Sequence, residues 1–130
     1  MSITVGMKGR AEAVVNEQNT AIAAASGTLP VFATPWMCAL MEKAAWTAIA
    51  PGLSDGESTV GTGLNITHSS ATPLGLKVWA ESEVTLVDGK RIELNVTAYD
   101  EKGLIGKGTH ERFIVTDTRF LAKTARKLEE

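Results

Sequence analysis

The chain has 130 residues and a mass of 13.8 kDa, which is the size of one domain spanning residues 1–130. A hydrophobic content of 44% with 22% charged residues excludes a disordered chain. Thirteen basic and fifteen acidic residues give a net charge of -2 without a long run of one sign, which argues against a nucleic-acid partner.

The first segment, 3–15, is rich in β-branched residues and predicts an edge strand interrupted by Gly6 and Gly9. The next segment, 16–28, is polar and then alanine-rich, and it fits a short helix or a mobile flap equally well. Residues 29–33 form a short extended run that leads into the main helix.

The main helix is predicted over residues 34–50. Thr34 is a favoured N-cap type, Pro35 suits the first helical position, and Pro51-Gly52 ends the helix. At about 100° per residue, one wide apolar stripe forms. It consists of Met37, Leu40, Met41, Ala44, Ala45 and Ala48.

The composition of this helix also indicates where in the cell the protein is expected. It is the most apolar window, but it carries Glu42 and Lys43 at its centre, which argues against a membrane span. Cys38 is the one cysteine, so no internal disulfide can form, and the first residues show no apolar run of signal-peptide length. We therefore expect a cytoplasmic protein with no membrane partner.

Everything after this helix is strand-like, up to a short basic helix predicted over 120–128. Strands are predicted over 57–68, from 76 up to a turn at 88–89, from 91 up to a turn at 100–103, and over 104–116, with a further turn at 71–75. In the first of these strands, alternation is expected to place Val60, Leu64, Ile66 and His68 on one face, with Gly61 and Gly63 on the other.

One long helix with so little charge needs burial nearly all round. The simplest arrangement is α+β, an antiparallel sheet wrapped round one central helix. Such a fold leaves an edge strand and one helix flank uncovered, which predicts a dimer.

Two histidines are candidates for chemistry. His68 ends a strand, and its position alone favours a hydrogen-bonded structural histidine over a functional one. His110 is expected to be structural as well, and Arg112 follows it on the same strand face. Two histidines and one cysteine at these spacings make no metal site, because zinc needs three or four clustered ligands.

Glu42 is the most unusual acid. Beside Cys38 and Trp46 its carboxylate would be partly desolvated and suited to acid–base chemistry, whereas the alternatives are an acid reaching to solvent or pairing with a partner chain. Thr34 precedes Glu42 by just over two turns, so both side chains can border one cleft. Cys38 could be a nucleophile with His68, but its position on the apolar stripe favours a buried small side chain.

Four segments carry a resemblance to a known family. They are 31–42 (VFATPWMCALME), 60–68 (VGTGLNITH), 71–75 (ATPLG) and 103–113 (GLIGKGTHERF). In combination they resemble the fluoroacetyl-coenzyme A thioesterase-like family of hotdog-fold proteins, over nearly the whole chain from about Val5 to Phe120.

The resemblance implies a hotdog fold and hydrolysis of an acyl-CoA thioester. It also implies a homodimer, or a dimer of such dimers, with active sites at the subunit interface. By the same resemblance Thr34, Glu42 and His68 are the catalytic set, and Gly61 and Arg112 contribute to substrate binding. No cofactor is implied, because coenzyme A is part of the substrate.

This sequence departs from the fluoroacetyl-specific members at one segment. Those members carry aromatic residues in a lid ahead of the helix, whereas 25–29 (ASGTL) has none. We therefore expect a small or medium acyl group rather than selectivity for fluoroacetyl. The alternatives are a non-catalytic acyl-CoA binding protein and a hotdog dehydratase or hydratase acting on the β-carbon.

Overall fold

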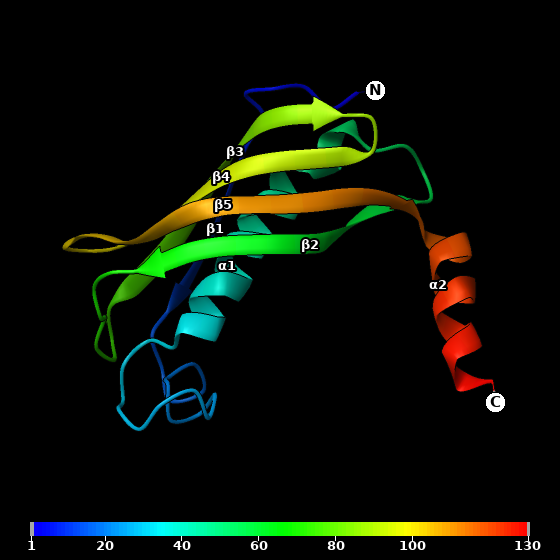
Figure 1. Cartoon of the computed structure of the whole chain (residues 1–130). Coiled ribbons are helices and arrows are strands. Elements are labelled where there is room, and N and C mark those ends of the chain that lie inside the picture. The colour runs from blue at the N-terminus through cyan, green and yellow to red at the C-terminus, as the bar shows by residue number, and fades with distance from the viewer. Residues whose placement is uncertain (1, 130) are drawn as a thin grey trace.

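The computed structural model describes residues 2–129 (Figure 1). Residues 2–129 form two helices and five strands, and a short 3-10 turn follows each helix. In chain order the elements are β1 (Lys8–Val14), α1 (Thr34–Ile49) with the turn Ala50–Gly52, β2 (Glu57–His68), β3 (Lys77–Asp88), β4 (Arg91–Asp100), β5 (Gly103–Thr116), and α2 (Asp117–Ala125) with the turn Arg126–Leu128.

The strands form one antiparallel sheet in the order β1-β3-β4-β5-β2, which curls round α1 (Figure 1). This confirms the predicted α+β arrangement, and β1 and β2 are its two edges. Since β2 has a neighbour only on its β5 side, one side of a 12-residue strand keeps its backbone groups unpaired within the sheet.

The core lies between α1 and the concave face of the sheet. All six residues of the predicted apolar stripe are buried, and Ile49 is buried with them. At Gly9, β1 passes very close to the helix backbone at Ala44 and Ala48. A Cβ atom on Gly9 would lie 2.1 Å from the Ala44 carbonyl oxygen, so only glycine fits at this position. Gly9 therefore does not interrupt the strand as predicted: it is what allows β1 to pack there.

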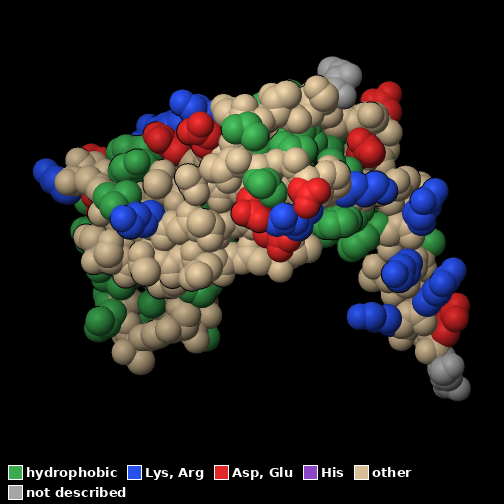
Figure 2. All heavy atoms as spheres, turned by 45° about the horizontal axis from the view of Figure 1, so that its top comes forward, with side chains coloured by type: hydrophobic (Ala, Val, Ile, Leu, Met, Phe, Trp, Pro, Cys, Tyr) green, Lys and Arg blue, Asp and Glu red, His purple; other side chains and the backbone are tan. Residues whose placement is uncertain are grey.

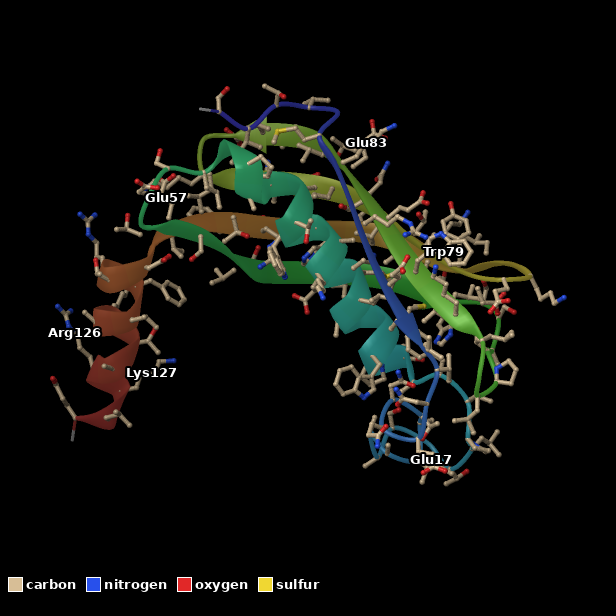
Figure 3. The ribbon with its side chains drawn as sticks, turned by 180° about the vertical axis from the view of Figure 1, so that it is seen from behind. Glu17, Glu57, Trp79, Glu83, Arg126 and Lys127 are labelled. Atoms are coloured by element: carbon tan, nitrogen blue, oxygen red, sulfur yellow. The ribbon has the colours of Figure 1, made fainter. Side chains whose placement is uncertain are left out.

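The segment between β1 and α1 forms turns. Of the two forms predicted for 16–28, the helix is wrong. Isolated bridges from Thr20 to Phe32 and from Val31 to Pro73 hold the segment beyond the N-terminal end of α1, where Figure 3 places Glu17.

A β-bulge in β2 corrects the predicted facing of its residues. Gly61 pairs with Arg112 and Gly63 with Glu111, so Thr62 is an extra residue relative to β5. The extra residue reverses the alternation, and Gly61 rather than Val60 shares the inward face with Leu64 and His68.

One further prediction is adjusted. α2 begins at Asp117, three residues before the predicted start of the basic helix at Phe120. Among residues 2–129, no helix combines the length and the apolar character needed to cross a membrane.

Candidate active site

Thr34 and His68 meet at one end of the sheet. Thr34 is the first residue of α1 and His68 is the last residue of β2. The Thr34 Oγ1 and His68 Nδ1 atoms are 2.7 Å apart, a hydrogen bond between residues 34 positions apart in the chain. The predicted capping role of Thr34 is wrong, because Ala33 is the N-cap and the hydroxyl is engaged by His68.

The environment of His68 keeps its imidazole neutral. Burial lowers the pKa of His68 below its ordinary value of 6.5, and the nearby Ser70 backbone offsets part of this effect. Within residues 2–129 its Nε2 atom is buried and has no hydrogen-bond partner. The tautomer with a proton on Nε2 lets Thr34 donate to Nδ1, and it leaves one N–H group free for a ligand.

A cavity of about 260 Å³ lies against this pair. Thr34 and His68 line it together with Ser69, Ser70 and Ala71 after β2, and Ala21, Ser26, Val31 and Phe32 from the turn segment. A buried, unpartnered imidazole atom beside a cavity is a group available to a bound molecule.

A second cluster forms round Glu42, in the middle of α1. Glu42 Oε2 lies 3.5 Å from Arg112 Nη1 and 3.9 Å from His110 Nε2. Gly61 makes room for this carboxylate, because a Cβ atom there would lie 2.5 Å from Glu42 Oε2. The Glu42 side chain is 44% exposed in the single chain, which agrees with the alternative in which the acid reaches solvent, and its ionic partner Arg112 belongs to the same chain.

Arg112 is fixed in place by hydrogen bonds. Although it is a charged residue, only 6% of its surface is exposed. Its Nε donates to Thr59 Oγ1 at 2.8 Å and its Nη2 donates to the Thr59 carbonyl at 2.9 Å. A buried guanidinium with this many partners holds one orientation, and the remaining direction is toward Glu42.

His110 supports the same guanidinium. Its Nδ1–H donates to the Gly63 carbonyl at 2.7 Å, which leaves Nε2 as an acceptor 3.2 Å from Arg112 Nη1. Burial lowers the pKa of His110, so it stays neutral in this role. The expected structural role of His110 matches these contacts, but its place behind Arg112 and Glu42 was missed. The spacing of two residues indicated that His110 and Arg112 share one strand face, but it did not indicate that Glu42 lies against them.

The structure therefore separates the predicted catalytic set. Thr34 and His68 form one group, and Glu42, Gly61 and Arg112 form the other. Thr34 and Glu42 are eight residues apart on α1, about 12 Å along the helix axis. Glu42 does not line the cavity beside Thr34 and His68, so the single chain does not bring all three predicted catalytic residues to that cavity.

Cys38 lies half-buried between these groups along the helix. Burial and then the charge of Glu42 raise the pKa of its thiol. A protonated thiol is a poor nucleophile, in agreement with the predicted role as a small packing residue. Within residues 2–129, no three His, Cys, Asp or Glu side chains are grouped to hold a metal ion.

Comparisons with known proteins bear on this geometry. Residues 15–118 match the family described as fluoroacetyl-CoA-specific thioesterase. The fluoroacetyl-CoA thioesterase of Streptantibioticus cattleyicolor is 44% identical over 97 residues, which cover 75% of this chain and 70% of that protein.

Solved structures of related proteins have a similar fold. A structure of the fluoroacetyl-CoA thioesterase FlK superposes with a TM-score of 0.91 at 36% identity, covering 98% of each chain. A hot-dog-like protein from Thermanaerovibrio acidaminovorans superposes with a TM-score of 0.86 at 25% identity, covering 98% of this chain and 94% of that one.

The fold and the site together define a thioester hydrolase of the hotdog class. Since the family match spans most of the chain, the chain belongs to the fluoroacetyl-CoA-specific thioesterase family. The resemblance drawn from the sequence motifs is confirmed.

Proposed function

We propose that this protein hydrolyses acyl-CoA thioesters with small acyl groups, at a site assembled from two copies of the chain. One protomer supplies Thr34 and His68, and its partner supplies Glu42 held by Arg112. The observation that carries the proposal is the 2.7 Å contact between Thr34 Oγ1 and His68 Nδ1 beside a cavity.

The hydrogen-bonded pair has the geometry of a nucleophile and its base. A neutral His68 can accept a proton as an oxygen attacks the thioester carbon, and the resulting imidazolium can protonate the departing CoA thiolate. The attacking oxygen is either that of Thr34, through an acyl ester, or that of a water molecule held by the pair. Backbone N–H groups in the first turn of α1 lack intrahelical partners and are suited to stabilise the oxyanion.

The uncovered surfaces of the single chain support a dimer. The free edge of β2 is 12 residues long, and Trp36 and Trp46 on α1 are 45% and 46% exposed. An edge strand with apolar residues beside it favours pairing with a second copy about a two-fold axis. In such a pair the two copies of β2 are antiparallel, so the middle of one helix approaches the start of the other.

This arrangement gives the hydrogen-bonded second cluster a function. Arg112 and His110 fix the Glu42 carboxylate, and its exposed part is free to face the partner's cavity. There it can hold or deprotonate the hydrolytic water. Arg112 thus supports Glu42, and Gly61 leaves space for the carboxylate, which gives both residues a role in building the site.

The acyl group is proposed to be small and not selected for fluorine. The cavity measures about 260 Å³, and the exposed segment 25–29 that precedes α1 has no aromatic side chain to close over it. Without such a lid, acetyl and fluoroacetyl differ little in the contacts available to them.

A panel of acyl-CoA esters tests the proposal. Free thiol released from acetyl-, fluoroacetyl-, butyryl- and octanoyl-CoA is measured with a thiol reagent. We expect turnover that is fastest with the short esters, and kcat/KM values for acetyl- and fluoroacetyl-CoA within about tenfold of each other, a difference of about 1.4 kcal/mol. Binding without thiol release across the panel would instead establish the non-catalytic alternative, and a much larger preference for fluoroacetyl would contradict the lid argument.

A further inference from the structure

The C-terminal helix α2 projects from the end of the sheet (Figures 1 and 2). Its first turn is anchored beside the start of β2, because the Asp117 N–H donates to the Gly56 carbonyl at 2.9 Å and the Asp117 carboxylate accepts from the Ser58 hydroxyl. Every residue from 118 to 129 is exposed. A helix that is anchored at one end and exposed along its length can bind a ligand or another protein chain.

One side of this helix and its final turn is basic. Arg119, Lys123 and Lys127 are spaced by four residues, and Arg126 lies three residues after Lys123, so the basic side chains lie on successive turns. Figure 2 shows Lys and Arg side chains along the length of α2. Within residues 2–129 none of the four has a carboxylate oxygen within 4.0 Å. Neighbouring like charges repel, and a bound anion relieves that repulsion.

This basic side cannot serve the site of its own chain. Figure 3 shows Glu57 at the start of β2 next to α2, whereas His68 ends the strand eleven residues later, roughly 36 Å away at the rise of an extended strand. When the β2 edges of two chains pair antiparallel, the start of one strand comes beside the end of the other. The first turn of α2, anchored at the start of β2, is then at the same end of the pair as the partner's His68, and the helix extends from there.

We propose that the basic side of α2 binds the phosphate groups of coenzyme A whose thioester lies in the partner's Thr34–His68 site. The proposal rests on the proposed function and on its dimer. Coenzyme A carries a diphosphate and a 3′-phosphate at the end remote from its sulfur, so a substrate that extends out of the cavity presents its charge at a distance from the reacting atoms. Arg126 and Lys127, labelled in Figure 3, supply the charge-assisted hydrogen bonds that phosphate oxygens accept.

The test compares substrates with and without the phosphates. For Arg126→Gln/Lys127→Gln, KM for acetyl-CoA is expected to rise about tenfold, the size expected of two exposed charge contacts, while kcat is unchanged. KM for S-acetylpantetheine, which lacks all three phosphates, is expected to stay the same. The control Lys8→Gln/Lys102→Gln removes two exposed lysines that have no ion pair among residues 2–129, and it is expected to leave both KM values unchanged.

Other outcomes overturn the proposal. Equal effects on the two substrates, or no change in KM for acetyl-CoA, would contradict it while leaving the hydrolysis intact. Loss of binding to phosphatidylserine vesicles with unchanged KM would assign α2 to a membrane surface. Should the protein release no thiol at all, the proposed function fails, and calorimetric titration with free CoA still decides whether the double substitution weakens binding.

Mixed dimers test the arrangement between chains. In a dimer of one His68→Ala chain and one Arg126→Gln/Lys127→Gln chain, the working Thr34–His68 pair comes from the second chain and its facing α2 from the first. KM for acetyl-CoA at wild-type level is expected. A raised KM there would show that α2 acts on its own chain, against the proposal.

Discussion

The two clusters on α1 differ in how completely their polar groups are satisfied. At the start of the helix, His68 keeps a buried Nε2 atom without a partner among residues 2–129, next to a cavity. Near the middle of the helix, Arg112 and His110 are hydrogen-bonded to each other, and each is also hydrogen-bonded to β2. Unsatisfied groups are available for chemistry, whereas a satisfied network holds one geometry. The comparison supports the proposal that the Thr34–His68 pair carries out the bond-making steps and that the residues round Glu42 serve to position groups.

Removing the imidazole is expected to have the largest effect. His68→Ala loses the base and the proton donor together, so kcat/KM for acetyl-CoA should fall about a thousandfold, within the range known for general acid–base groups. Thr34→Ser keeps the hydroxyl and should retain most activity, whereas Thr34→Ala should not. A trapped acyl ester on Thr34, sought by mass spectrometry of rapidly quenched enzyme, distinguishes attack by the hydroxyl from attack by water. Activity of His68→Ala near that of the wild type would contradict the assignment.

Alanine substitutions at Gly61 and Gly63 test the role of the cluster round Glu42. In Gly61→Ala the new methyl group would lie 2.5 Å from Glu42 Oε2, so the carboxylate must leave Arg112. We expect kcat/KM to fall about tenfold to a hundredfold, the usual consequence of a misplaced catalytic group. Glu42 can move its flexible end toward solvent, whereas His110 Cε1 and Arg112 Nη1, at 3.3 and 3.4 Å from the added methyl group, need to shift only slightly, so the loss of stability should be small.

Gly63→Ala is the matched control on the same strand. There the added methyl group meets only Glu111 atoms at 3.8 Å, an ordinary contact. Equal losses of activity in the two variants would show that glycine matters to the strand itself and not to Glu42.

The sequence allowed the elements to be predicted better than the site. Pro35 and the apolar stripe marked α1, and the bounds of β2 were predicted at residues 57 and 68 as observed. The bulge at Thr62 could not be predicted from the sequence. With or without an inserted residue, the apolar residues of β2 fit an alternating strand, so the pattern does not show which residues face the helix. Only the register with β5 reveals that Gly61 faces Glu42.

The role of Thr34 shows a similar limit. Capping preference is a local property, and it correctly marked the start of the helix. The hydroxyl instead bonds to a residue 34 positions away, which the sheet brings to the helix start. The separation of Glu42 from this pair, in contrast, follows from helix rise, because eight residues span about 12 Å, and it could have been calculated from the predicted helix.

A smaller effect is expected in the pH dependence. His68 must be neutral to accept a proton, and burial lowers its pKa below the ordinary 6.5, so kcat/KM should remain high at pH 6.5 and decline only at lower pH. The stability of the fold should also decrease at low pH. The pKa of His110 is lowered by burial, so below pH 6.5 the unfolded chain binds protons that the native chain does not. The free energy of unfolding is therefore highest above pH 6.5 and decreases as the pH falls below it. Urea denaturation at several pH values, paired with initial rates, measures both. An acid limb centred above pH 6.5 would contradict the assignment of His68.

The central claim is that one active site contains residues from two chains, and mixed dimers of two inactive variants test it most directly. His68→Ala and Glu42→Gln chains, each expected to be nearly inactive alone, are mixed after reversible dissociation. In the mixed dimer, the intact Thr34–His68 pair of one chain meets the intact Glu42 of the other. Half of the dimers are mixed and each contains one complete site of two, so about one quarter of wild-type activity should return. Activity that stays at the level of the separate variants would show that Thr34, His68 and Glu42 act within a single chain.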